Sequence, residues 1–284
     1  MEWTSILSGD PLSRSTENTI DGATMTAELR ELYDYRELLV MIAIRDIKVR
    51  YKQSLMGFLW AILMPLLIVT AGIIVRYAYA IASKKPLDLT DVAVVATKSI
   101  PWAFLVSSIK FSCQSLIGNN NLVTKVYFPK EVFPMAAVLS QLFDLSIASS
   151  VLVFLLVVAK VGLSFQILWV VPLLAILIML AVGIGLLVSA GSLFFRDVKY
   201  IVEVFLTFAI FFTPVFYDVS MFGPKGRWLL LNPVAPILEG FSSIIRGQTP
   251  DWHWVLYSLI FATLTTLFGY MLFKKVEPSF AENI

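Results

Sequence analysis

The side chains best suited to bind an anion are four cations close together in the sequence, Arg45, Lys48, Arg50 and Lys52. They lie in the second half of the segment Tyr33 to Lys52, whose first half carries apolar residues at helical spacing. A helix of this kind lies at a membrane interface, with its cations among the lipid headgroups. The sequence therefore predicts an interfacial helix that contacts phosphate groups. A basic flank that only orients the chain in the membrane is the alternative.

Residues for covalent or metal chemistry are scarce by comparison. The chain has one cysteine, Cys113, and one histidine, His253, so neither an intrachain disulfide nor a His-pair metal site can form. The nucleotide-binding pattern GxxxxGK[ST] and the nucleophile elbow GxSxG are both absent from the sequence. We therefore predict no catalytic residue, no metal site and no cofactor bound by this chain.

Three charges interrupt otherwise apolar stretches: Arg76, Lys110 and Asp144. An ionisable side chain inside a membrane costs at least about 2.5–3.5 kcal/mol, so it faces a partner or water. Counting along the expected helices places Lys110 and Asp144 at similar depths, where they could pair. Such a pair is either structural or part of a polar pathway.

Aromatic residues provide a further pattern. Phe205, Phe208 and Phe212 share one face of an expected helix, because they recur at helical spacing. Sugar rings stack on aromatic faces through their apolar C–H surfaces, so this stripe could line a carbohydrate channel. Together with Lys110 and Asp144 it gives five candidate channel residues. Helix packing or contact with lipid is the alternative for the stripe.

The composition places these residues in a membrane protein. The chain has 284 residues, of which 58% are hydrophobic and only 15% charged, and its mean hydropathy is +0.81. Soluble domains average about 45–50% apolar and about 25% charged residues. A water-soluble enzyme is therefore excluded, and the net charge of +2 gives no reason to expect nucleic-acid binding.

The elements that must position the candidate residues are membrane-spanning helices, each needing about 20 mostly apolar residues. Six stretches qualify: Met56 to Ala82, Ser99 to Gly118, Phe133 to Ala159, Ile167 to Phe194, Ile201 to Tyr217, and Trp254 to Phe273. We expect an all-α polytopic membrane protein with six transmembrane helices. Lysine and arginine are more frequent on the side that carries both termini, which predicts that both termini are cytoplasmic.

The domain organisation follows from these spans. We expect a flexible cytoplasmic tail over residues 1–27, an amphipathic interface helix within 28–55, a six-span domain over 56–276, and a short cytoplasmic tail over 277–284. Between the second and third spans, Asn119 to Glu131 carries apolar and aromatic residues on a short loop. Exposed apolar side chains on such a loop indicate docking of another protein, and packing on neighbouring helices is the alternative.

The external segment Asp218 to His253 is too apolar for a solvated loop. Backbone that does not span the membrane is tolerated at membrane depth only when it is buried in protein or lines a cavity. We expect two short helices, Lys225 to Leu231 and Ala235 to Ile245, broken at Asn232 and Pro233, that dip back into the outer leaflet. They either close a pore or form a plain amphipathic cap.

Several short motifs, in a fixed order over most of the chain, resemble those of polysaccharide-exporting ABC permeases. They are Arg45 to Ser54 followed by Gly57 and Trp60, Asn121 to Lys130, Phe195 to Tyr200, Thr213 to Val215, and Leu231 to Pro233. The sequence is most similar to the Wzm-type permeases of O-antigen export, with teichoic-acid permeases as near relatives. Each motif is weak alone, and the ordered combination carries the resemblance.

The resemblance implies a homodimer with two copies of a separate ATPase subunit, which bind ATP and Mg. It implies that a coupling helix sits in a groove of the ATPase, formed by Asn121, Leu122, Val123, Thr124, Lys125, Val126, Tyr127, Phe128, Pro129 and Lys130. It implies that the external helices form a gate, with Trp228, Asn232, Pro233 and Pro236 as candidate residues. The channel would lie between the two copies.

The resemblance also implies a substrate, a glycan linked to a lipid diphosphate of the undecaprenyl type, exported across a bacterial inner membrane. Arg45, Lys48, Arg50 and Lys52 would supply the countercharge to the diphosphate. Two other functions stay open from the residues alone. One is export of a drug or lipid by the same fold, and the other is a membrane-embedded glycolipid enzyme or scaffold.

Overall fold

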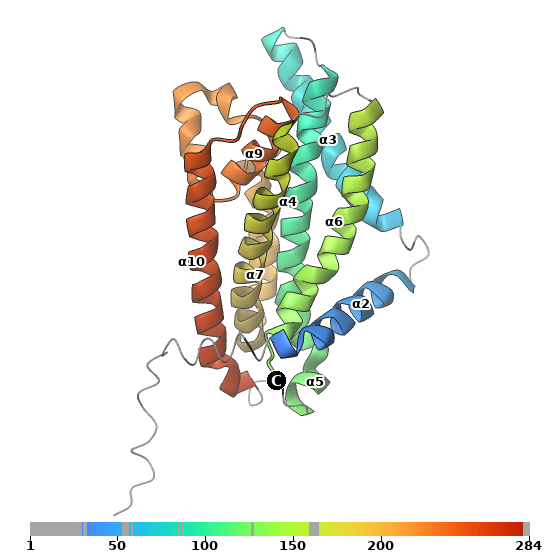
Figure 1. Ribbon diagram of the computed structural model, residues 1–284, viewed down its shortest axis with the longest axis vertical. Coiled ribbons are helices and arrows are strands. Elements are labelled where there is room, and N and C mark those ends of the chain that lie inside the picture. Colours follow the sequence, from blue (N-terminus) through green and yellow to red (C-terminus); the bar gives the residue numbers. More distant parts are fainter. Residues whose placement is uncertain are drawn as a thin grey trace, which may run out of the picture.

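The computed structural model describes residues 30, 33–52, 57, 59–84, 86, 88–125, 128–158 and 165–280 (Figure 1). Within these residues every regular element is a helix, which confirms the predicted all-α fold. The predicted tail over residues 1–27 lies outside the described residues, as does 281–284 of the predicted C-terminal tail.

Five of the described helices are long and apolar enough to cross a membrane. They are α3 (Leu59–Ser83), α4 (Leu89–Ser115), α6 (Val132–Val158), α7 (Val170–Phe194) and α10 (Trp252–Val276). Four of the five lie within a few residues of the predicted spans, because long apolar runs are the strongest signal of a spanning helix. The chain is therefore a multi-pass membrane protein.

The remaining predicted span is shorter than expected. In place of Ile201 to Tyr217 the structure has α8 (Val198–Phe212), a helix of 15 residues. Such a helix is about 22 Å long, whereas the hydrocarbon core of a bilayer is about 30 Å thick. The end of α7 at Leu193 and the end of α10 at Phe273 join the same apolar cluster. The chain must therefore cross the bundle between them, and α8 begins this sixth crossing.

The second predicted span begins too late in the sequence. The prediction started at Ser99, but α4 begins at Leu89, ten residues earlier. Asp88 caps this helix by accepting a hydrogen bond from the backbone N–H of Leu89 at 2.7 Å, and Asp91 completes a capping box. As a result Lys98, which directly precedes the predicted span, lies inside a spanning helix.

Short helices mark the two ends of the bundle (Figure 1). At one end, called the α5 end, α2 (Arg36–Lys52) runs obliquely across the bundle and packs on α6. The hexapeptide helix α5 (Asn120–Lys125) protrudes there. At the opposite α9 end lie a 3-10 segment, η4 (Val219–Leu231), and α9 (Ala235–Ile245). The predicted helix Ala235 to Ile245 is confirmed, and the segment before it begins earlier than the predicted Lys225.

The core is built around α4, which packs on α3, α6, α7 and α9. α7 and α10 approach each other closely, and small residues permit it. A Cβ at Gly183 would lie 2.7 Å from the backbone nitrogen of Thr266, and one at Gly269 would lie 2.6 Å from the carbonyl oxygen of Gly183. Small residues at such contacts let membrane helices pack backbone against backbone. α10 is thereby fixed to the centre of the bundle.

Candidate functional site

The α5 helix presents a polar surface. Asn121, Thr124 and Lys125 are exposed, whereas Val123 is 2% exposed and faces the bundle. The predicted exposure of aromatic side chains here is wrong for Phe128, which is 7% exposed and packs against the ring of Phe133 at 5.4 Å. The ring is drawn into the apolar cluster at the α5 end because burial removes it from water.

The other residues of the predicted coupling segment also differ in how exposed they are. Leu122 is partly buried and Pro129 is buried, while Lys130 is intermediate in exposure. Val126 and Tyr127 lie outside the described residues. Among the described residues of this segment, the side chains most open to contact by another protein are therefore the polar ones on α5.

The four cations of α2 differ in whether they have an ion-pair partner, which the sequence did not show. Arg45 lies 2.7 Å from Oδ1 of Asp46, and its guanidinium also donates to the side-chain oxygen of Asn119 at 2.7 Å. Asn119 stands directly before α5. Arg45 therefore joins α2 to the start of α5.

Arg50 pairs with Asp144 at 2.5 Å, and both side chains are about one-fifth exposed. Tyr51 donates a hydrogen bond to the same carboxylate. Burial and this carboxylate raise the pKa of Tyr51 to about 12, so the phenol stays a neutral donor. Asp144 lies twelve residues beyond the first residue of α6, about 18 Å along the helix. The C-terminal half of α2 therefore reaches well along α6 rather than remaining at its end.

The predicted pairing of Lys110 with Asp144 is wrong. Lys110 lies 3.7 Å from Oε1 of Glu203 on α8, and both of these side chains are more than one-third exposed. The sequence could not reveal that α2 would carry Arg50 to Asp144, because the two residues are 94 positions apart. Asp144 is thus neutralised by α2.

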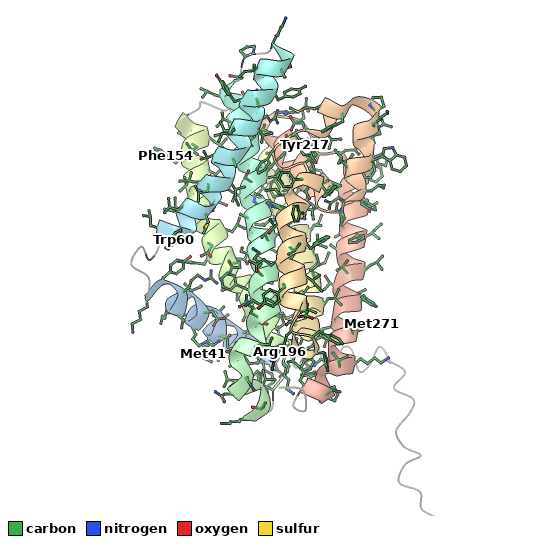
Figure 2. The ribbon with its side chains drawn as sticks, turned by 180° about the vertical axis from the view of Figure 1, so that it is seen from behind. Met41, Trp60, Phe154, Arg196, Tyr217 and Met271 are labelled. Atoms are coloured by element: carbon green, nitrogen blue, oxygen red, sulfur yellow. The ribbon has the colours of Figure 1, made fainter. Side chains whose placement is uncertain are left out.

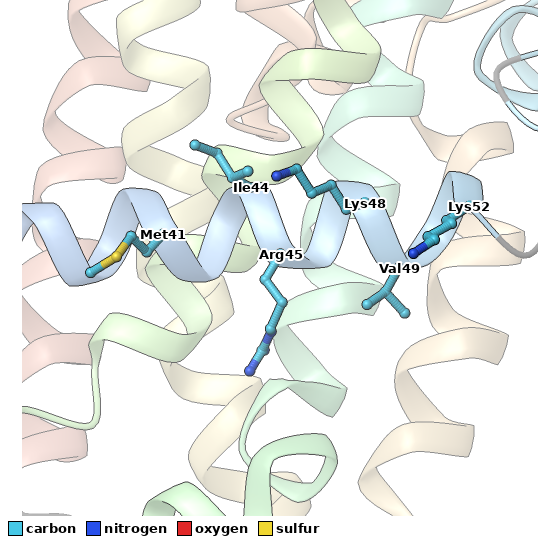
Figure 3. Close-up of a pocket in the computed structure, with 6 residues that line it drawn as sticks. All are labelled: Met41, Ile44, Arg45, Lys48, Val49 and Lys52. Carbon is cyan, nitrogen blue, oxygen red and sulfur yellow. The ribbon is translucent and has the colours of Figure 1, made fainter.

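Lys48 and Lys52 have no ion-pair partner within the described part of the chain, and both are exposed. They line a groove of about 620 Å³ on the outer side of α2 (Figure 3). The described residues that line it all belong to α2, and they are Met41, Ile44, Arg45, Lys48, Val49 and Lys52. Alternating apolar and cationic side chains in one groove suit an anionic amphiphile, whose phosphate needs countercharge and whose chain needs apolar contact.

At the α9 end the structure contains a buried charge cluster that the sequence did not predict. Lys98 is 0% exposed. Its ammonium donates to Oδ1 of Asp218 at 2.7 Å, to Oε1 of Glu239 at 2.7 Å and to the carbonyl of Tyr217 at 2.9 Å. All three ammonium protons are therefore satisfied, as a buried charge requires.

Two arginines complete this cluster on the second oxygen of Asp218. Arg76 on α3 lies 2.6 Å away and Arg246, directly after α9, lies 2.5 Å away. Burial alone would raise the pKa of Asp218, but Lys98, Arg76 and Arg246 hold it well below its usual range. Because Asp218 precedes η4 and Arg246 follows α9, their contact closes residues 218–246 into one cap.

The candidate gate residues lie within this cap. Trp228 is 75% exposed, whereas Pro236 is buried. The side chain of Asn232 donates to the hydroxyl of Thr213 at 2.9 Å, and the carbonyl of Pro233 accepts a hydrogen bond from Ser258 at 2.8 Å. The break between η4 and α9 is thereby attached to the end of α8 and to α10.

The aromatic stripe is on the surface of the chain. Phe205, Phe208 and Phe212 are 70%, 58% and 72% exposed along α8. Lys110 and Glu203 are exposed beside its N-terminal half. α8 therefore presents an exposed aromatic face, and Glu203 with its ion pair lies on another side of the helix, because residues two positions apart do not share a face. Figure 2, seen from behind, shows Arg196, two residues before α8, at the same end of the bundle as Met41 and Met271.

Together these features define an all-α, multi-pass membrane protein with a basic helix across one end and a cap folded back into the other. Within its described residues no cluster of His, Cys, Asp and Glu could hold a metal ion. The chain belongs to the ABC-2 type transporter family, whose model matches residues 37–245. Proteins of this family are transport permeases.

Known relatives align over most of this chain. It is 28% identical over 248 residues to an O-antigen export system permease protein, RfbA, of Klebsiella pneumoniae, covering 87% of this chain and 94% of the relative. It is 25% identical over 264 residues to RfbA of Myxococcus xanthus, covering 90% and 98%. It is 24% identical over 244 residues to the polysialic acid transport protein KpsM of Escherichia coli, covering 83% and 92%.

Proposed function

We propose that this chain is the membrane subunit of an ATP-driven exporter of a lipid-linked polysaccharide resembling O-antigen. The observation that carries the proposal is the match to the ABC-2 type transporter family over residues 37–245. The relatives named as O-antigen and polysialic acid transport proteins support a polysaccharide as the cargo. By this proposal the chain lies in the bacterial inner membrane with both termini in the cytoplasm.

ATP and Mg belong to a separate ATPase subunit in this proposal, present in two copies on the side of the α5 end. The protruding α5 supports this assignment, because Asn121, Thr124 and Lys125 offer a polar surface outside the bundle. Closure of the ATPase subunits would push on α5. Arg45 would pass part of that displacement to α2, since it holds Asn119 directly.

The groove of α2 is the proposed site for the diphosphate of the lipid carrier. Lys48 and Lys52 face this groove with their charges uncompensated by other described residues, so they take the countercharge role. Arg50 instead holds α2 against Asp144. The structure therefore favours two of the four predicted cations for direct contact with the headgroup, whereas Arg45 also lines the groove but is paired with Asp46.

The polymer would pass between two copies of the chain, along the aromatic face of α8. The exposure of Phe205, Phe208 and Phe212 supports this path, because the apolar faces of sugar rings stack on aromatic side chains. The cap over residues 218–246 would close the pathway at the α9 end. The homodimer, the channel and the gate are all parts of this proposal.

The test is purification of the tagged full-length chain in mild detergent, with identification and stoichiometry of the proteins that remain bound. We expect an ATPase at one copy per copy of the chain. Lys125→Glu on α5 should reduce its recovery, whereas the same change at Lys225 on the cap should not. A chain that purifies without any ATPase, or equal losses for both variants, would contradict the proposal.

A further inference from the structure

The segment that follows α5 is tied to the far end of the sequence. The ammonium of Lys274, near the end of α10, lies 2.8 Å from Oε1 of Glu131 and 3.1 Å from Oε2 of Glu277. The other oxygen of Glu277 accepts a hydrogen bond from the backbone N–H of Lys130 at 3.1 Å. Lys274 and Glu277 thus connect the end of α10 to the two residues directly before α6.

An aromatic contact reinforces these ion pairs. Phe280 is 0% exposed and its ring packs on Phe273 at 5.2 Å and Phe194 at 6.0 Å. The ammonium of Lys130 lies 5.9 Å from the centre of the same ring, within the range of a cation–π contact. Phe280, Phe128 and Val123 belong to one apolar cluster. The contact between the two segments is therefore both polar and apolar.

Glu131 is the least expected member of this group. Its side chain is 1% exposed, and burial raises its pKa although Lys274 opposes the shift. A buried carboxylate left without its cationic partner is strongly disfavoured, so it is retained where the partner is held close. Lys274 must therefore stay close to Glu131.

α5 cannot hold its own position. It has six residues, and isolated helices shorter than about 12–15 residues are marginal even in favourable sequences. Within α5 only Val123 is buried. Its place depends on its flanks, where Arg45 holds Asn119 before it and the Lys274 group holds Lys130 and Glu131 after it.

We propose that Lys274, Glu277 and Phe280 are positioning residues that brace the α5 segment (residues 119–131) against α10. We name these three residues the α10 brace. Through it, displacement of α5 by a partner subunit reaches α10 directly, in addition to α4 and α6. Since α10 packs on α7 and α9, the brace also links the docking end to the cap. This role rests on the proposed function, because it requires a partner that moves α5.

The first test measures the brace without any partner. Amide hydrogen exchange is followed in the full-length chain in lipid nanodiscs for Lys274→Met and for the matched control Lys275→Met. Lys275 is the exposed neighbour and has no ion pair among the described residues. We expect exchange in residues 119–131 to be about tenfold faster in Lys274→Met, with α7 and the control unchanged. Equal exchange in the two variants would overturn the brace.

A double variant separates the brace from a general loss of folding. Glu131→Gln combined with Lys274→Met removes both charges of this ion pair, so the segment should regain part of its protection. If Lys274→Met unfolds the whole chain and the double variant does too, the brace is contradicted as a local device. A double variant that exchanges more slowly than Lys274→Met supports it.

The second test measures transmission in the native host. Lys274→Met is expected to retain the co-purified ATPase and its ATP hydrolysis while lowering surface polysaccharide at least about fivefold relative to Lys275→Met. A purely structural role would lower all three together and would overturn the transmission role. If the wild-type chain binds no ATPase, the proposed function fails, and the exchange measurement still decides the brace.

Discussion

Replacing Lys98 by methionine is the sharpest test of the buried charge cluster at the α9 end. The two side chains have similar lengths, so the change removes a charge and leaves little cavity. It deletes three donated hydrogen bonds, to Asp218, Glu239 and the carbonyl of Tyr217. It also leaves two carboxylates without the ammonium between them.

The loss in the free energy of unfolding depends on which partners the two carboxylates keep. Removing one partner of a buried ion pair costs about 3–5 kcal/mol. Asp218 keeps Arg76 and Arg246, and Glu239 is 23% exposed and can be hydrated. We therefore expect the lower limit of that range, a loss of about 3 kcal/mol in the free energy of unfolding.

The assay is thermal unfolding of the full-length chain in mild detergent, followed by helical circular dichroism. Lys225→Met is the matched control, because Lys225 is exposed on the same cap and surface changes usually stay within about 0.5 kcal/mol. The Tm of Lys98→Met should fall by about 6 °C or more. The two variants unfolding at the same temperature would refute the view that Lys98 holds the cap to α4.

Three further predictions concern other ionisable groups. Lys98 and the two arginines outweigh burial and hold the pKa of Asp218 low. The ordinary pKa of an aspartate is about 4, so the charged form of Asp218 stabilises the fold in full above about that pH. The Tm difference between wild type and Asp218→Asn should therefore be constant from about pH 8 to 5 and shrink only below about pH 4. The pKa shift of Glu131 has the opposite direction, because burial raises it. Wild type should therefore gain stability relative to Glu131→Gln as the pH falls through the raised pKa. A stability difference that does not change with pH would contradict this. Asp144→Asn should loosen α2, which faster tryptic cleavage after Lys52 would reveal, and unchanged cleavage would disprove.

The sequence predicted the spanning helices well because each depends on its own apolar run. α3, α6, α7 and α10 match their predicted spans closely, and the broken segment before Ala235 is present as expected. The prediction failed where a charge has a distant partner. Lys98 looked like a loop residue, yet Asp218, which is 120 positions away, neutralises it inside α4.

The same limit applies at the α5 end. The four cations of α2 looked equivalent in the sequence, but Arg50 is taken up by Asp144, while Lys48 and Lys52 face a groove. Phe128 was expected on the docking surface and instead fills an apolar cluster that includes Phe280. These differences arise from contacts between residues that are far apart in the sequence, and local sequence patterns do not predict such contacts.

The most direct test of the central claim is where the polysaccharide accumulates when the chain is depleted from its host. The account predicts that surface polysaccharide is lost while glycan joined to its lipid diphosphate accumulates at the cytoplasmic face of the inner membrane, and that the wild-type chain restores export. Lys48→Glu combined with Lys52→Glu should fail to restore it, because the groove of α2 would repel the diphosphate. Unchanged surface polysaccharide and no build-up of lipid-linked glycan after depletion would contradict the claim.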